Sequence, residues 1–243
     1  MPDQLTIYQQ QADQYERLVA REDYQQRLFP ALAAIRSFDH ADIVEWGAGT
    51  GRISALLAPR ARSIIAGDLN PHMLHRAVAK YRLIPQLKWQ AVAMDHRRAP
   101  LPDRLADVAI AGWTLCYLAR PYCGATWRQE IAQAIQQMQR VLRPGGTIIL
   151  IETLGTGATE PKPPTDWFAE YFAFLEDELG FHSTWVRTDY QFASLDEAVE
   201  LLSFFWDAQF GETARRNNWI ITPECTGLWW KEVSEGQRAN VIS

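Results

Sequence analysis

The sequence predicts an α/β fold with a doubly wound, mostly parallel sheet that carries helices on both faces. Five short apolar runs between residues 40 and 153 alternate with helical patterns or with spans long enough to hold a helix. Two extended segments later in the chain bring the expected sheet to seven strands. A glycine-rich turn joins the first apolar run to the first helical pattern. Strands that alternate with helices in this way are typical of a parallel sheet.

Local signals place the elements along the chain. Asn70 and Pro71 have the residue types of a helix N-cap and first helical position, so a helix is expected over 71–83. Another is expected over 126–142, where apolar residues recur on one helical stripe before the sequence RPGG ends it. The strands are expected at 42–46, 63–68, 87–93, 106–114 and 147–153, with two more within 181–192 and 224–232.

The chain is expected to form one domain over residues 1–243, in three parts. Residues 1–40 form an N-terminal helical segment and residues 41–153 the core. Residues 154–243, after a connector rich in Gly and Pro, form an aromatic-rich cap together with the final strands. Within this cap Ser194 and Glu197 have the spacing of a capping box, which predicts a helix over 195–210. A chain of 243 residues is long enough for such a domain.

Composition restricts the setting. The formal net charge is −5 and no long basic run is present, so no nucleic-acid partner is expected. Three cysteines without a C-x-x-C pair indicate reduced thiols, and their spacing predicts no metal site. No apolar run approaches the ~18 residues of a membrane span, and the N-terminal stretch is polar. We therefore expect a cytoplasmic protein, monomeric or homodimeric, with no membrane partner.

The glycine loop lies in the sequence VEWGAGTGRIS at residues 44–54. A phosphate-binding P-loop requires Lys and then Ser or Thr after its last glycine, whereas Arg52 and Ile53 follow Gly51 here. The dinucleotide fingerprint needs a third small residue where Arg52 stands, so NAD or FAD is disfavoured. There remains the pattern E-x-G-x-G-x-G, with Asp68 at the end of the second strand and Asp95 just after the third.

With the segments IIAGDLNPHML, VAMDH and VLRPGGTIILIE, this loop resembles the class I S-adenosylmethionine-dependent methyltransferases, in the small-molecule branch called type 11 or UbiE-like. The resemblance covers residues 40–153 and implies a Rossmann-like sheet, S-adenosylmethionine as cofactor and S-adenosylhomocysteine as product. It places the glycine loop against the methionine part, Asp68 on the ribose hydroxyls and Asp95 at the adenine amine. Glu45 stands where Asp is more frequent in the family, and we expect it to anchor the loop or reach the ligand's ammonium through water.

Other residues join this expected cofactor site. Tyr15 matches the tyrosine that often covers the cofactor's carboxylate end in the family, with Tyr24 as second choice; a plain packing helix is the alternative. The expected cofactor-binding residues are Tyr15, Glu45, Gly47, Ala48, Gly49, Thr50, Gly51, Asp68, Leu69, Met94, Asp95, His96 and Trp113.

Methyl transfer from a sulfonium needs mainly in-line alignment and exclusion of water, without metal or covalent nucleophile. An acceptor proton must still be removed, and Tyr117 or His182 is the expected base or orienting group. We expect an apolar or aromatic acceptor between residues 112–117 and the cap, with core packing as the alternative for the cap rings. The expected acceptor contacts are Tyr24, Tyr117, Trp167, Tyr171, Tyr190 and Trp206.

Three functions remain open at this point. The first is methyl transfer to N, O or C of a small molecule. The second is a nucleic-acid or protein methyltransferase, although GWTLCYL after the fourth strand differs from the Asn/Asp-Pro-Pro-Tyr type sequence of nucleic-acid amino methylation. The third is a non-catalytic S-adenosylmethionine-binding protein or a redox enzyme on the same fold.

Overall fold

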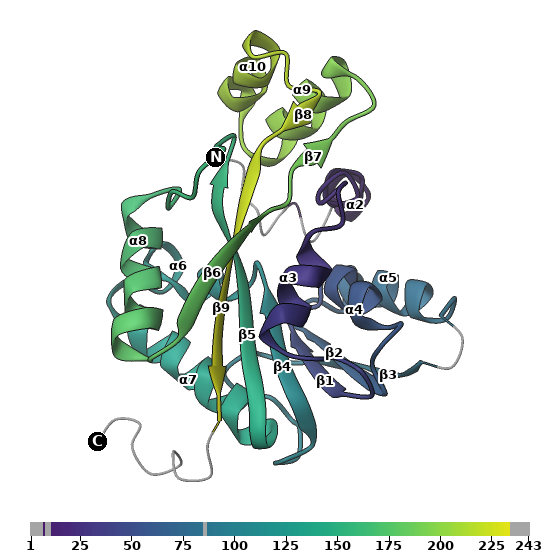
Figure 1. Ribbon diagram of the computed structural model, residues 1–243, viewed down its shortest axis with the longest axis vertical. Helices are drawn as coiled ribbons and strands as arrows, with labels where there is room; N and C mark the ends of the chain where they lie inside the picture. The colour runs from purple at the N-terminus through teal and green to yellow at the C-terminus, as the bar shows by residue number, and fades with distance from the viewer. Residues whose placement is uncertain (1–6, 8–10, 85–86, 234–243) are drawn as a thin grey trace.

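The predicted sheet is present in the structure. The computed structural model describes residue 7, residues 11–84 and residues 87–233. Seven strands form one sheet in the order β3-β2-β1-β4-β5-β9-β6, of which β9 runs antiparallel to both its neighbours (Figure 1). The strands are β1 (Asp42–Trp46), β2 (Ser63–Asp68), β3 (Lys88–Ala93), β4 (Ala106–Gly112), β5 (Leu142–Thr156), β6 (His182–Arg187) and β9 (Glu224–Glu232). This arrangement confirms the mostly parallel α/β fold.

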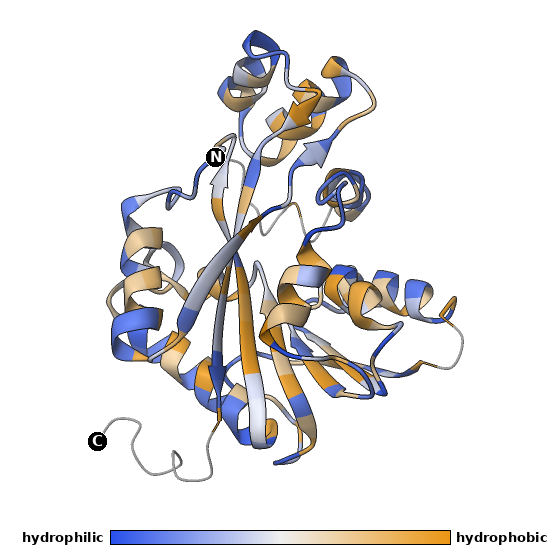
Figure 2. Cartoon of the chain, viewed as in Figure 1, coloured by the Kyte–Doolittle hydropathy of each residue, from blue (hydrophilic) through white to orange (hydrophobic). Residues whose placement is uncertain are grey.

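Both faces of the sheet are covered, and alternate strand residues enter two different cores. Val44 and Trp46 of β1 belong to the core that includes α7 and α8, whereas Ile43 belongs to the core that includes α3 and α4. The alternation repeats in β5, where Ile148 and Leu150 enter the first core and Ile149 and Ile151 the second, and burial on both faces explains this continuous apolar run (Figure 2). The helices involved are α3 (Leu28–Ile35), α4 (Arg52–Leu57), α5 (Pro71–Tyr81), α7 (Trp127–Val141) and α8 (Asp166–Ala173).

The sheet order reverses direction at β1, whose neighbours are β2 on one side and β4 on the other. The chain leaves β1 to build β2 and β3 outward, and then returns to build β4 and β5 on the opposite side. In open α/β sheets the crevice at such a reversal, beyond the carboxyl ends of the strands, is where ligands bind. The segments that follow β1, β2, β3 and β4 therefore frame the candidate site.

Two helical segments are interrupted where the sequence suggested continuity. The N-terminal segment divides into α2 (Ala12–Val19) and α3, because Asp23 and Gln26 between them take positive φ angles of 57° and 55°. The helix expected over 195–210 divides into α9 (Leu195–Phe205) and α10 (Ala208–Arg216). Asp207 begins the second helix because its side chain accepts a hydrogen bond from the Phe210 N–H at 2.8 Å.

The remaining short elements complete the cap and the loop after β4. These are η1 (Leu115–Leu118), α6 (Arg120–Cys123), η2 (Gly124–Thr126), η3 (Phe174–Glu178), β7 (Tyr190–Gln191) and β8 (Ile221–Thr222). β7 and β8 form a two-stranded sheet beside α9 and α10, at one end of the molecule (Figure 1). Among the described residues no helix is long and apolar enough to cross a membrane.

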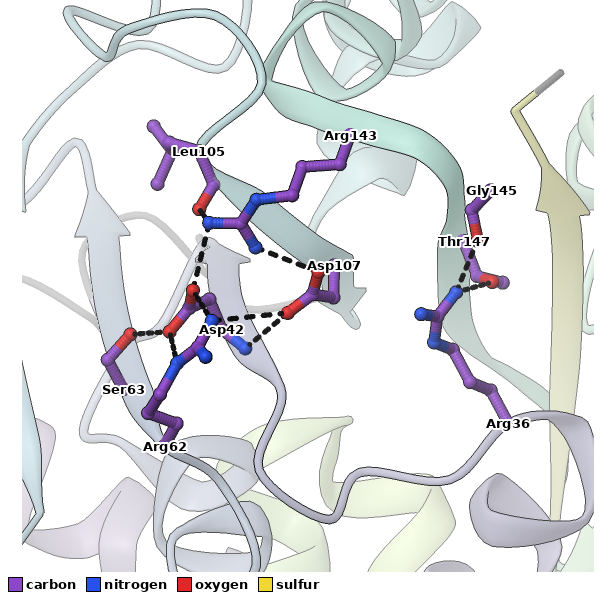
Figure 3. A network of polar contacts seen from close by, with 9 residues as sticks. All are labelled: Arg36, Asp42, Arg62, Ser63, Leu105, Asp107, Arg143, Gly145 and Thr147. Atoms are coloured by element: carbon purple, nitrogen blue, oxygen red, sulfur yellow. Dashed lines mark hydrogen bonds and ion pairs between the residues drawn. The ribbon is translucent and has the colours of Figure 1, made fainter. Parts of the chain in front are cut away.

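An ion-pair network links the strands at their amino ends, at the edge of the sheet opposite the candidate site (Figure 3). Arg143 donates to Asp107 Oδ1 at 2.8 Å and to Asp42 Oδ2 at 2.9 Å, so one guanidinium bridges two carboxylates. Asp42 also accepts from Arg62 and from the Ser63 hydroxyl. The hydrogen bond from Arg62 is the main cause that holds the pKa of Asp42 well below its ordinary value. The network joins residues of β1, β2, β4 and β5, which keeps the strands in register.

Candidate active site

A cavity of about 720 Å³ lies at the carboxyl ends of the central strands. Its walls come from α2, from the glycine loop, and from the segments that follow β2, β3 and β4. Cavities of roughly 300–1,000 Å³ hold small molecules and cofactors. The lining residues expected from the sequence are Tyr15, Glu45, Gly47, Ala48, Gly49, Thr50, Asp68, Leu69, Asp95, His96, Trp113 and Tyr117.

The three glycines of the loop have different tasks. Gly47 and Gly51 take φ angles of +67° and +82°. A Cβ on Gly47 would lie 2.1 Å from Thr114 Oγ1, and a Cβ on Gly51 would lie 2.7 Å from the Tyr81 hydroxyl. Gly49, at φ +52°, differs because the nearest atom to an added Cβ is Met73 Cε at 3.6 Å. The outer glycines thus allow close packing of the protein against itself. Gly49 presents bare backbone to the cavity.

Asp68 fixes the loop to the end of β2. Its Oδ2 accepts the Gly49 N–H at 2.7 Å and its Oδ1 accepts the Asn70 N–H at 2.7 Å. Burial raises the pKa of Asp68, while these two backbone donors oppose the shift. Each carboxylate oxygen has a second lone pair beyond the bond that it accepts. Asp68 is therefore held rigidly at the cavity wall with capacity for two more donors.

Asp95 and His96 form another part of the wall. Asp95 accepts from Arg97 Nε at 2.8 Å and Nη2 at 2.5 Å, and this pairing lowers the pKa of Asp95 to about 2. His96 Nε2 lies 3.0 Å from Thr114 Oγ1, and its buried Nδ1 has no hydrogen-bond partner among the described residues. Burial lowers the pKa of His96 to about 4, so its imidazole is neutral at pH 7. A neutral ring offers one donor and one acceptor to a ligand.

Glu45 lies beneath the glycine loop with 2% of its surface exposed. The Ser54 hydroxyl donates to its Oε2, and burial raises the pKa of Glu45 to about 8. The carboxyl group is therefore protonated near neutral pH. It connects β1 to α4 and reaches the cavity wall.

The segment after β4 closes the cavity on the side of the cap. Trp113 has a positive φ of 50°, which is uncommon for a residue with a side chain, and the Arg52 guanidinium lies 4.3 Å from its ring centroid. Tyr117 in η1 lines the cavity, and its ring centroid is 5.1 Å from that of Tyr122. These residues place aromatic surface beside the polar groups of the glycine loop. Among the described residues, no group of three or more His, Cys, Asp or Glu side chains is arranged to hold a metal ion.

Comparison with known proteins agrees with this geometry. Residues 44–150 match the family model described as a methyltransferase domain. The match begins in β1 and ends in β5, so it contains the glycine loop, Asp68 and Asp95. Over this region the chain is similar to the class I S-adenosylmethionine-dependent methyltransferases of the type 11 branch, in agreement with the resemblance of its motifs.

Curated methyltransferases match the same region. The chain is 30% identical over 118 residues to malonyl-[acyl-carrier protein] O-methyltransferase of Serratia marcescens, covering 49% of this chain and 40% of that protein. It is 32% identical over 113 residues to demethylmenaquinone methyltransferase of Chlorobaculum tepidum, covering 46% and 40%. The chain thus spans about two fifths of the length of these relatives.

Solved structures share the fold over most of the chain. N-methyltransferase NodS of Bradyrhizobium japonicum has a TM-score of 0.51 at 19% identity, covering 87% of this chain and 97% of that one. The [4+2]-cyclase SpnF has a TM-score of 0.54 at 18% identity, covering 86% and 81%. Because a cyclase is among these neighbours, the fold alone does not fix the reaction.

Several residues expected at the cofactor or acceptor site do not line the cavity. Met94 is buried against Gly67, and Gly51 packs against Tyr81, so neither lines the cavity. His182 is exposed at the start of β6, beside Trp230. β6 is the outermost strand of the sheet, where His182 pairs with Trp230, and His182 is not among the residues that line the cavity. The structure therefore keeps His182 away from the cavity, which corrects its expected role as a base.

The expected cap contacts also lie outside the cavity wall. Trp167 stacks on Phe168, with ring centroids 3.9 Å apart, and Tyr171 is fully buried. Tyr190 and Trp206 pack together beside α2, and Tyr24 lies in the turn between α2 and α3. The rings of Trp167, Tyr171, Tyr190 and Trp206 pack in hydrophobic clusters of the core and of the cap. The acceptor contacts expected from Tyr24, Trp167, Tyr171, Tyr190 and Trp206 are corrected accordingly, and Tyr117 alone of that set lines the cavity.

Two residues outside the list of expected binding residues also belong to the site. Thr114 fills the space over Gly47 and pairs with His96. Arg52 lines the cavity, and its Nη1 donates to Glu22 Oε2 at 2.7 Å. From the sequence, Arg52 serves only to exclude other types of glycine loop. Its contact with Glu22, thirty residues earlier, could not be predicted because no local pattern indicates it.

Glu152, at the end of the parallel stretch of β5, supports η1 from behind. Its Oε1 accepts the Cys116 N–H at 3.1 Å and the Tyr171 hydroxyl at 3.3 Å. Burial raises the pKa of Glu152 from 4.5 to about 7, although these hydrogen bonds oppose the shift. Between those two values the folded protein retains a proton that the unfolded chain releases. The contribution of Glu152 to the free energy of unfolding therefore falls as the pH rises through this window, and this contribution is constant above it.

We expect Glu152→Gln to remove this pH dependence. The free energy of unfolding of the variant minus that of the wild type should rise from about pH 5 to about pH 7 and then level off. Denaturant unfolding of both proteins at several pH values measures the difference. A difference that does not vary with pH would show that Glu152 does not hold a proton in the folded state.

Proposed function

We propose that the chain transfers a methyl group from S-adenosylmethionine to an N, O or C atom of a small molecule, without a metal ion. The observation that carries the proposal is the pairing of Gly49 with Asp68 on the wall of a cofactor-sized cavity at the sheet reversal. The names of the relatives, which refer to a malonyl group on a carrier protein and to demethylmenaquinone, support a small acceptor group. We also propose that residues 1–243 form one cytoplasmic domain, as a monomer or homodimer.

The cavity residues fit the parts of such a cofactor. The spare lone pairs of Asp68 match the two donors of a ribose diol, as charge-assisted hydrogen bonds. Asp95 and the neutral His96 offer acceptors and a donor to adenine. The bare backbone at Gly49 and the ring of Tyr15 flank the space left for the methionine part.

The protein's part in the reaction is to orient the reactants and exclude water. S-Adenosylmethionine supplies an activated methyl group when bound. Trp113 and Tyr117 then form the wall against which the acceptor is placed in line with the transferred carbon. The Tyr117 hydroxyl orients the acceptor or takes its proton.

Tyr117→Phe should lower turnover about 10- to 100-fold, once an acceptor is known, because a general base or orienting group is lost. Affinity for S-adenosylhomocysteine should change less than threefold, since the ring remains. Tyr171→Phe is the matched control, because its hydroxyl is buried on Glu152 away from the cavity. Turnover that falls equally in both variants would contradict a role of Tyr117 at the reacting atoms.

Two assays separate this proposal from the alternatives. Incubation with methyl-labelled cofactor and candidate acceptors tests catalysis against a non-catalytic binding protein, and label in a small-molecule product supports the proposal. Binding to RNA that weakens steeply with salt would favour a nucleic-acid methyltransferase. Identification of a copurified ligand by mass spectrometry would name the acceptor.

A further inference from the structure

The short helix η1, which carries Tyr117 to the cavity wall, begins without a cap of its own. Its first hydrogen bond runs from the Tyr117 N–H to the Thr114 carbonyl at 3.1 Å, so the preceding Cys116 N–H has no partner within the turn. Thr114 has the residue type of an N-cap, but its side chain makes no capping bond, and its Oγ1 lies 3.0 Å from His96 Nε2 instead. The start of η1 therefore depends on a group from elsewhere in the chain.

Glu152 of β5 supplies that group. Its Oε1 accepts the Cys116 N–H at 3.1 Å, and both residues are buried, so water is not available to replace this bond. The preceding residue of β5 holds the same segment, because the Trp113 N–H donates to the Ile151 carbonyl at 2.7 Å. Two successive residues at the end of the parallel stretch of β5 thus fix the turn from Trp113 to Cys116. Tyr117 is the next residue, so this turn sets its place at the cavity wall.

We propose that Glu152 is a positioning residue, which places Tyr117 for the acceptor through the Cys116 N–H. This inference rests on the proposed function, in which Tyr117 orients the acceptor or takes its proton. A buried N–H that loses its acceptor must find another, so removal of the Glu152 carboxyl forces η1 to rearrange. Glu152 itself does not line the cavity. Its effect on the reaction passes through the position of Tyr117.

The protonation of Glu152 gives this link a measurable signal. In the described part of the chain, the titratable groups that face Glu152 are the Cys116 thiol from η1 and the Tyr171 phenol from α8. Burial raises the pKa of each of these two groups well above its ordinary value, so neither changes charge near neutral pH. Burial raises the pKa of Glu152 to about 7. A neutral carboxyl accepts a hydrogen bond more weakly than a carboxylate does, so Glu152 holds η1 less firmly below this pH.

The test is fluorine NMR of protein labelled with 3-fluorotyrosine, in which Tyr117→Phe and Tyr171→Phe assign the two resonances. The Tyr171 resonance reports the protonation of Glu152 directly, because its hydroxyl donates to Oε1 at 3.3 Å. In the wild type both resonances should shift with one midpoint, near the Glu152 pKa of about 7. Tyr171→Phe should raise the midpoint of the Tyr117 shift, since a hydrogen bond that favours the carboxylate is lost. A Tyr117 resonance that stays fixed while that of Tyr171 shifts would overturn the proposal.

Two substitutions separate positioning from a structural role alone. Glu152→Gln keeps an oxygen for the Cys116 N–H and cannot change charge, so the Tyr117 resonance should stay near its low-pH position at every pH. Glu152→Ala removes the acceptor and should move or broaden that resonance, while affinity for S-adenosylhomocysteine changes less than threefold by calorimetry. A Tyr117 resonance that is unchanged in Glu152→Ala, or that still shifts in Glu152→Gln, would refute the positioning role. If Glu152→Ala does not fold, Glu152→Gln and Tyr171→Phe decide between the two outcomes.

Turnover provides a second readout once an acceptor is known. Glu152→Ala should lower kcat about tenfold and leave the KM for S-adenosylmethionine within threefold, because the acceptor is misplaced while the cofactor is not. Glu152→Gln should restore most of the lost kcat, and a loss of equal size in both variants would contradict the proposal. Wild-type protein that does not bind S-adenosylhomocysteine would contradict the proposed function itself, whereas the two resonances test the link from Glu152 to Tyr117 without an acceptor.

Discussion

Gly49→Val will abolish measurable binding of S-adenosylhomocysteine while the fold survives. Gly49 lines the cavity, and an added Cβ meets no protein atom closer than Met73 Cε at 3.6 Å, so the new side chain projects into ligand space. At φ +52° a β-branched residue is also strained, which shifts the N–H that anchors the loop on Asp68. Calorimetry should show a loss of at least 100-fold in affinity.

Gly145→Val is the control for backbone strain alone. Gly145 has φ +74° with no atom within 4 Å of an added Cβ, and its N–H donates to Val233, away from the cavity. This variant should lose a similar amount of stability and retain its affinity for S-adenosylhomocysteine. If Gly49→Val bound the ligand as tightly as the wild type, the loop would be only a tight turn.

Asp68→Ala should weaken S-adenosylhomocysteine binding at least tenfold. The variant removes the proposed acceptor of the ribose diol, at about 1.5–3 kcal/mol for each charge-assisted bond, and releases the Gly49 N–H. Asp68→Asn keeps one side-chain oxygen, so its affinity for S-adenosylhomocysteine should lie between those of Asp68→Ala and the wild type.

Ligand choice separates the two contributions of Asp68. A 2′-deoxyribose analogue of S-adenosylhomocysteine should bind the wild type more weakly than the parent ligand does. It should lose less affinity than the parent on substitution of Asp68. Equal losses for both ligands would mean that Asp68 acts only by holding the loop, contrary to the proposed diol contact.

The core and most of the cofactor wall could be predicted because their determinants are local. The glycine loop, Asp68 and Asp95 each lie at or just after the end of a strand, and parallel strands bring their carboxyl ends to one edge of the sheet. A short sequence around each residue is therefore enough to place it. Met94 and Gly51 belong to the segments that form the cavity wall but do not line the cavity themselves. Met94 packs against Gly67 and Gly51 against Tyr81, and a short sequence does not show which residues of a loop face inward.

The cap could not be placed from sequence, because its position depends on strand direction and long-range packing. His182 is the first residue of β6, the outermost strand of the sheet, and no residue near it indicates where that strand pairs. The spacing of aromatic residues such as Trp167 and Tyr171 along a helix is the same whether their rings contact a ligand or pack in the core. The pair of Arg52 and Glu22 likewise joins segments that only the tertiary fold brings together.

The most direct test of the central claim is calorimetric titration of the purified chain with S-adenosylhomocysteine, in the presence of a metal chelator, and with NADH in parallel. The account predicts one S-adenosylhomocysteine bound per chain, without added metal, and no binding of NADH. Affinity for NADH together with none for S-adenosylhomocysteine would contradict it.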